Sequence, residues 1–167
     1  MKKLKSFLAL LAAAALVFTL AACEQASDGD DTDYGAAPPA NLVGTWEGEV
    51  NFGFGAAEMT VKIEASGKVT MTTFMDMTTM VQMSAALSGM TEAEVWASMQ
   101  EDQVEPGTTF STSTPWTMTS VQVSLYEEMS SEASITVSGN TMTVVTTEVD
   151  DETGEETEMT MTFTRVS

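Results

Sequence analysis

Apolar and polar residues alternate along most of the chain from Leu42 onward, in short runs rich in Val, Thr, Met and aromatic residues. A period of two is typical of β-strands with one buried and one wet face. The runs predict strands at Gly44–Phe52, Glu58–Ala65, Lys68–Phe74, Thr108–Ser113, Trp116–Glu127, Glu132–Val137, Thr141–Val149 and Thr157–Val166. Ser66-Gly67 and Gly139-Asn140 suit tight hairpins between such runs, so we expect antiparallel pairing. The pattern predicts an all-β domain that closes as a barrel or packs as a sandwich.

The segment around residues 78–103 lacks this alternation and carries apolar residues at helical intervals. Met80, Met83, Leu87 and Met90 form one stripe, and Val95, Trp96 and Met99 form another. Thr91-Glu92-Ala93-Glu94 is a capping-box pattern, and Gly89 suits the end of a preceding helix. We therefore expect a helical insertion of two helices, or one broken helix, between the third and fourth strands.

The first residues have the pattern of a secretion signal. Lys2, Lys3 and Lys5 precede an apolar stretch, Phe7–Leu20, which is too short to be read as a membrane span. It ends in Leu20-Ala21-Ala22-Cys23, which resembles the lipobox of bacterial lipoproteins. The resemblance implies that residues 1–22 are removed and that Cys23 is acylated. The protein would then be held by its lipid anchor at a membrane of the bacterial cell envelope, with inner and outer membrane both open.

A change of composition divides the remaining chain into two parts. Residues 23–41 contain several Asp, Gly and Pro residues and almost no large apolar side chain, so they predict a disordered acidic tether. Residues 42–167 carry the strand pattern and form one predicted domain.

Charge and the scarcity of reactive side chains narrow the function classes. The sequence holds 25 acidic and six basic residues, and three of the basic ones lie in the signal segment. Nucleic acid is therefore an improbable partner, and an anionic bilayer surface would repel the domain. Histidine is absent and Cys23 is the sole cysteine, which excludes Ser-His-Asp, Cys-His and His- or Cys-ligated metal chemistry. We expect no catalytic residues, no cofactor and no enzyme activity.

Three motifs invite a metal interpretation and are better explained otherwise. Asp28–Asp33 lacks the Gly and Glu positions of an EF-hand loop. Asp150–Glu156 could bind calcium weakly, although a polar hairpin loop accounts for the same residues. Met75, Met77, Met80 and Met83 could gather around Cu(I), but methionine is used throughout the expected core, where it serves as packing. We predict no metal site.

The start and end of the domain carry a resemblance to a known superfamily. Gly44-Thr45-Trp46 at the first strand and Arg165 near the end of the last strand resemble the lipocalin and wider calycin pattern. The resemblance implies an antiparallel up-and-down β-barrel of about eight strands, in which Trp46 packs against Arg165 to close one end. It also implies a small hydrophobic ligand.

The expected function follows from these observations. Our first hypothesis is a membrane-anchored, lipocalin-like, non-catalytic lipoprotein that binds a small hydrophobic ligand. Met80, Met83, Trp96 and Met99 would contribute to the mouth of the barrel, since methionine and tryptophan present a soft apolar surface. The alternative is a solid-core envelope lipoprotein that acts as a structural or protein-interaction module, because small eight-stranded barrels can be filled by their own side chains.

Overall fold

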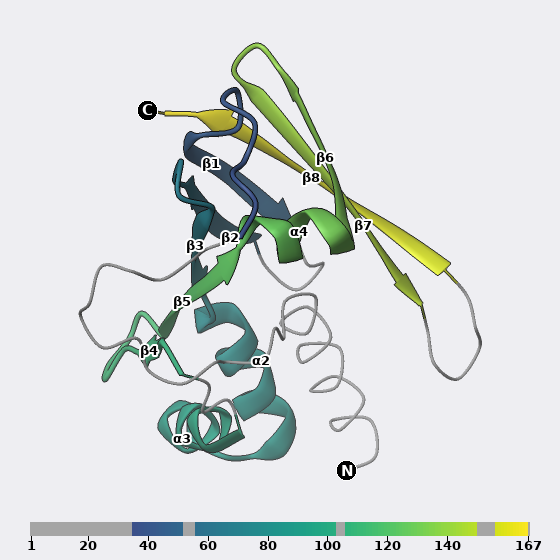
Figure 1. Cartoon of the computed structure of the whole chain (residues 1–167). Helices are drawn as coiled ribbons and strands as arrows, with labels where there is room; N and C mark the ends of the chain where they lie inside the picture. Colours follow the sequence, from purple (N-terminus) through teal and green to yellow (C-terminus); the bar gives the residue numbers. More distant parts are fainter. Residues whose placement is uncertain (1–34, 52–55, 103–105, 150–155, 167) are drawn as a thin grey trace.

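A computed structural model describes residues 35–51, 56–102, 106–149 and 156–166 (Figure 1). Its strands and helices are β1 (Gly44–Asn51), β2 (Ala56–Ile63), β3 (Lys68–Asp76), α2 (Thr78–Ser88), α3 (Glu92–Asp102), β4 (Thr108–Phe110), β5 (Thr117–Leu125), α4 (Tyr126–Glu132), β6 (Ala133–Ser138), β7 (Thr141–Val149) and β8 (Glu156–Arg165). The structure is mostly β, and the eight antiparallel strands and the helical insertion that the sequence predicts are confirmed. The signal segment, Cys23 and Asp28–Asp33 lie outside the described residues.

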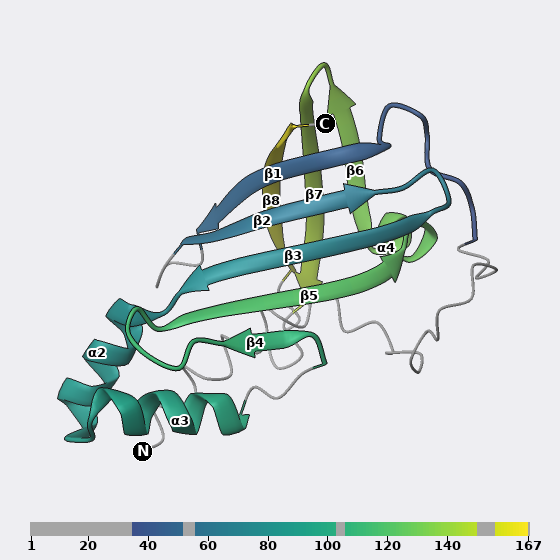
Figure 2. The same ribbon diagram turned by 90° about the vertical axis from the view of Figure 1, so that its left-hand side faces the viewer.

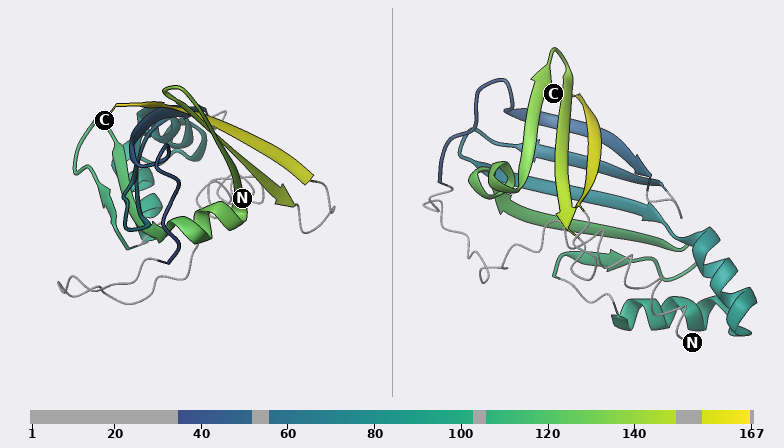
Figure 3. Two further views of the ribbon diagram at one scale, coloured as in Figure 1. Left: turned by 45° about the horizontal axis from the view of Figure 1, so that its top comes forward. Right: turned by 90° about the vertical axis from the view of Figure 1, so that its right-hand side faces the viewer.

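The strands form one sheet in the order β4-β5-β3-β2-β1-β8-β7-β6. Figures 2 and 3 show that this sheet is folded into two layers that cross: β1 to β5 form one, and β6 to β8 form the other. The layers meet where β1 pairs with β8, and only Trp46↔Arg165 and Glu47↔Thr164 are in register there. By contrast, β1 pairs with β2 along its whole length, from Gly44↔Ile63 to Asn51↔Ala56. The junction between the layers is therefore short.

The expectation of a closed up-and-down barrel is wrong. Within the described chain the sheet stays open, with β4 and β6 as its two edges, and β5 rather than β4 lies beside β3. The chain passes from the first layer to the second through α4, which lies across the open side (Figure 3). A β-barrel closes only when the two edge strands of its sheet pair with each other, and here the edge strands β4 and β6 are not paired.

Gly48 allows the second layer to approach the first closely. A Cβ atom at this position would lie 2.5 Å from the carbonyl oxygen of Thr162 and 2.8 Å from the ring of Phe163. Both distances are shorter than any ordinary contact of a Cβ atom. The absence of a side chain at Gly48 therefore lets β8 and its Phe163 ring pack directly on β1.

The space between the layers holds the main hydrophobic core. Alternation in β2 buries Ala57, Met59, Val61 and Ile63, as the period-two pattern predicts. Leu42 and side chains from β1, β3, β6, β7, β8 and α4 join three of these in one cluster. Its members are Leu42, Trp46, Val50, Met59, Val61, Ile63, Val69, Met129, Ala133, Met142, Val144, Met161 and Phe163.

A second, separate cluster fixes the helical insertion at one end of the sheet (Figures 1 and 2). It contains Ala57, Met75, Met77, Met80, Val81, Val95, Trp96 and Trp116. Trp96 lies between Trp116 and Phe110, with ring centroids 5.6 Å from each. Its indole nitrogen donates to the carbonyl of Ser111 at 2.9 Å, so the apolar ring is buried while its polar atom is paired.

Two elements were not expected from the sequence. Helix α4 occupies residues that the strand pattern assigned partly to strands and partly to a connection. Its start is capped by the Glu128 carboxylate, which accepts a hydrogen bond from the backbone N–H of Leu125 at 3.2 Å. Within the segment predicted as a tether, Pro38 is buried and its neighbour Pro39 accepts a hydrogen bond from the backbone N–H of Leu42 at 2.8 Å.

Candidate binding cleft between the two sheet layers

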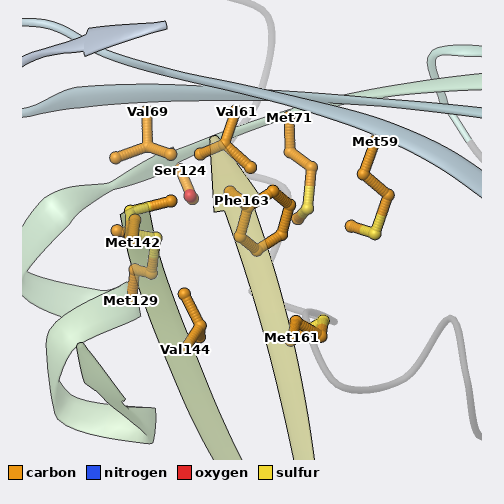
Figure 4. A pocket seen from close by; sticks show the side chains of 10 residues that line it. All are labelled: Met59, Val61, Val69, Met71, Ser124, Met129, Met142, Val144, Met161 and Phe163. Carbon is orange, nitrogen blue, oxygen red and sulfur yellow. The ribbon is translucent and has the colours of Figure 1, made fainter. Parts of the chain in front are cut away.

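A cleft lies between the two layers, inside the main core. Its walls are Met59, Val61, Val69, Met71, Ser124, Met129, Met142, Val144, Met161 and Phe163. Figure 4 shows that the side chains of β2 and β3 point toward those of β7 and β8 across this space. Met129 of α4 also lines the cleft. The cleft is therefore built by both layers and by the helix that joins them.

The chemistry of the walls is almost purely apolar. Five of the ten lining residues are methionine, three are valine, and the others are Phe163 and Ser124. Methionine has three rotatable bonds and a polarizable sulfur, so such a wall adapts its shape more readily than one of branched side chains. None of the described residues that line the cleft is titratable, so these walls are suited to hold hydrocarbon rather than to perform acid–base chemistry.

Ser124 is the one polar side chain among the described wall residues. It lies on β5 opposite Val69 of β3 and is partly exposed. Its hydroxyl group makes no hydrogen bond with the described residues. The hydroxyl is not a buried unpaired group, because the described residues contain no buried polar side-chain atom without a partner. The Ser124 hydroxyl is therefore available to a polar atom of a bound molecule.

The cleft is narrow as it stands. Its cavity volume is about 20 Å³, which is little more than the minimum that one water molecule requires. A molecule larger than water can enter only if the methionine side chains rotate or if the two layers move apart. The open side of the sheet permits the second movement, because β5 and β6 are not hydrogen-bonded to each other.

Trp46 and Arg165 are brought together at the junction of the layers. The Arg165 guanidinium carbon lies 4.2 Å from the centre of the Trp46 ring, whose residue is fully buried. The guanidinium also donates to the carbonyl of Val43 at 2.7 Å and to that of Asn41. The indole nitrogen of Trp46 donates to the carbonyl of Leu42 at 2.9 Å. This pair fastens the layers at one end of an open sheet rather than closing a barrel.

The four residues predicted at a mouth do not line this cleft. Met80 and Trp96 are buried in the second cluster, and Met99 packs against it. Met83 is 53% exposed. The stripe on α3 is explained by packing in the second cluster, whereas most of the other stripe is exposed. The described structure therefore does not bring these four residues to the cleft, and their role at a mouth stays a prediction.

The metal motifs also have definite places where they are described. Met75, Met77 and Met80 are buried side chains of the second cluster, and Met83 does not share their surroundings. No group of three or more His, Cys, Asp or Glu residues that could hold a metal ion occurs in the described ranges. Asp150–Glu155 lie outside those ranges.

Comparison with protein-family models, with curated proteins and with solved structures gives no match for this chain. No helix in the described part has the length and apolar character needed to cross a membrane.

The cleft residues could have been found only in part from the sequence. Alternation places Met59, Val61, Met142, Val144, Met161 and Phe163 on inner faces, which the period-two pattern indicates. Met129 was missed because it lies on the unexpected helix α4. Ser124 was missed because nothing in the local pattern separates a hydroxyl that faces a cleft from one that faces water.

Proposed function

We propose that this chain is a non-catalytic, lipid-anchored lipoprotein of the bacterial cell envelope that binds the apolar part of a small molecule between its two sheet layers. The observation that carries the proposal is the methionine-lined cleft between the layers, whose described lining residues carry no charge. Anchoring rests on the Leu20-Ala21-Ala22-Cys23 motif. The Trp46–Arg165 contact supports a lipocalin-like origin.

Three physical features favour a slender apolar occupant. Hydrocarbon gains free energy when it leaves water for an apolar site, at about 0.8 kcal/mol per CH₂ group. Thioether side chains rotate aside at low cost, so they can exchange contacts with each other for contacts with the occupant. The short β1–β8 junction lets the layers separate while the Trp46–Arg165 contact holds one end.

Two observations favour the alternative of a solid-core interaction module. The cavity of about 20 Å³ is small beside the several hundred Å³ that pockets for small molecules usually offer. In addition, Met83, Leu87 and Met90 of the insertion are exposed, with Leu87 at 87%. Such an apolar patch is a common feature of protein contact surfaces.

A fluorescence titration with the neutral probe N-phenyl-1-naphthylamine distinguishes the two functions. A soluble Cys23→Ser protein without residues 1–22 should enhance the probe's emission saturably. Val144→Phe fills the cleft and should weaken probe binding at least about tenfold, whereas Val145→Phe, on the opposite face of the same strand, should leave it unchanged.

Val144→Phe overpacks the core and should lower the free energy of unfolding by about 1 to 3 kcal/mol. Met71→Phe, which replaces methionine by a side chain of similar volume, serves as a second cleft variant. Circular dichroism establishes that each variant is folded. Two outcomes would show that the binding function is wrong: no enhancement of the probe's emission by the folded wild-type protein, or a loss of affinity in Val145→Phe as large as in the two cleft variants. Either outcome would favour the interaction module.

A further inference from the structure

The mature chain holds few positive charges that could recognise an anionic headgroup. The sequence has six basic residues, and after removal of residues 1–22 only Lys62, Lys68 and Arg165 remain, against 25 acidic residues. The positions of these three side chains therefore decide whether a carboxylate or a phosphate can be bound at the cleft.

None of the three lines the cleft. Lys62 is exposed between the inward residues Val61 and Ile63 of β2, and its amine pairs with Glu64 at 2.7 Å. Lys68 directly precedes Val69, which faces the core, so strand alternation places Lys68 on the other face of β3. The Arg165 guanidinium is stacked on Trp46 and donates to the carbonyls of Val43 and Asn41.

An anionic headgroup at this cleft would also meet an unfavourable field. The surplus of acidic over basic side chains makes the domain strongly negative, and an approaching anion is repelled over distances of about 10 Å at moderate salt. A carboxylate that entered the apolar walls would lose its hydration without gaining a cation. The Ser124 hydroxyl offers hydrogen bonds, but it carries no charge.

We propose that the cleft selects uncharged amphiphiles, namely a single acyl or alkyl chain whose headgroup carries hydroxyl or ester oxygens, and that it discriminates against fatty acids and phospholipid-like anions. This proposal rests on the binding function proposed above and names its ligand class. The chain occupies the methionine-lined space, and Ser124 donates to or accepts from the headgroup at the rim.

The test compares two ligands that share one chain length and differ only in charge. Binding of 1-monolauroylglycerol and of laurate is measured below their micelle concentrations, by displacement of N-phenyl-1-naphthylamine, at pH 8 and low salt. The wild-type protein should bind 1-monolauroylglycerol about tenfold or more tightly than laurate, because the anion meets repulsion and finds no cation in the walls.

A pair of variants locates the effect. Ser124→Lys places an ammonium group at the cleft and should raise the laurate affinity about tenfold while leaving 1-monolauroylglycerol unchanged or weaker. Val123→Lys adds the same charge on the opposite face of β5, where Val123 is 57% exposed, and should change the laurate affinity much less. Circular dichroism establishes that both variants are folded. If a variant does not fold, the comparison of the two ligands on the wild-type protein still tests the selectivity.

The outcomes separate this inference from the proposed function. If laurate binds the wild-type protein as tightly as 1-monolauroylglycerol, the selectivity is wrong while the binding function stands. If both lysine variants raise the laurate affinity equally, the discrimination arises from overall charge and the role of Ser124 is wrong. If neither ligand displaces the probe and the probe itself does not bind, the binding function is wrong, and the ligand class with it.

Discussion

The contacts of Arg165 join β8 to β1 and to the segment that precedes β1. Its guanidinium stacks on Trp46 of β1 and donates to carbonyls of Val43 and Asn41, which precede that strand. A guanidinium offers five donors in a planar group, so it can satisfy both carbonyls while stacking on the indole ring. A neutral, unbranched side chain of similar length would keep the apolar packing but would lose the two hydrogen bonds and the cation–π contact.

Arg165→Met should therefore destabilise the protein by about 1 to 3 kcal/mol, because two backbone carbonyls lose their donors and the cation–π contact disappears. The measurement is the free energy of unfolding in urea, followed by tryptophan fluorescence. Lys62→Met removes an exposed charge pair and should change stability by no more than about 0.5 kcal/mol. Equal effects of the two substitutions would show that the Arg165 contacts add no stability.

Gly48 carries a second prediction at the same scale. Gly48→Ala forces its new methyl group against the Thr162 carbonyl and the Phe163 ring, so the two layers must shift apart. We expect a loss of about 1 to 3 kcal/mol in the free energy of unfolding, whereas Glu49→Ala, at the next and exposed position of β1, should be close to neutral. A Gly48→Ala protein as stable as the wild type would contradict the close approach of β8 to β1.

At the scale of elements, hydrogen bonds to carboxylates begin the two inserted helices. Asp76 accepts from the backbone N–H of Thr78 at 2.9 Å, at the start of α2. Glu94 accepts from the backbone N–H and the hydroxyl of Thr91, both at 2.8 Å, at the start of α3. Hydrogen bonds with the Thr78 side chain and backbone lower the pKa of Asp76 below 3.8. Those with the Thr91 backbone and side chain lower the pKa of Glu94 below 4.5.

The sign of the resulting pH dependence follows from these lowered pKa values. Groups with a folded pKa below the unfolded value stabilise the protein above the unfolded pKa, and that contribution is lost as the pH falls through the folded pKa. Asp76→Asn/Glu94→Gln should thus be less stable than wild type at about pH 6, and the difference should shrink toward about pH 3. Urea unfolding at each pH measures it, with Glu101→Gln on α3 as the control. A difference that stays constant with pH would contradict the capping role.

The elements show where sequence patterns determine structure and where they do not. Period-two runs located all eight strands within a few residues, and the capping box at Thr91–Glu94 located α3, because these are local signals. Helix α4 was missed, since Tyr126–Glu132 spans only seven residues and its role is to connect the two layers. The stripe Met80, Met83 and Leu87 predicted a helix correctly, but periodicity alone does not show which partner covers a helix face.

At the scale of the whole molecule, the unpaired side of the sheet could not be predicted from residue patterns. Closure of a barrel depends on whether β5 or β4 meets β6, which is a relation between segments far apart in the sequence. The same is true of the cleft, which needs β2 and β3 to face β7 and β8. Once the layers are known, its apolar walls and the absence of cations follow directly from the inward positions of each strand.

The central claim is that an apolar chain enters the cleft between the layers, and methyl NMR of ¹³C-methionine-labelled protein tests it most directly. Titration with 1-monolauroylglycerol should shift the methyl signals of the cleft residues Met59, Met71, Met129, Met142 and Met161. Those of Met75, Met77 and Met80, in the second cluster, should move little. Single Met→Leu variants assign the signals. Unchanged cleft signals at saturating ligand, or shifts confined to exposed Met83 and Met90, would contradict the account.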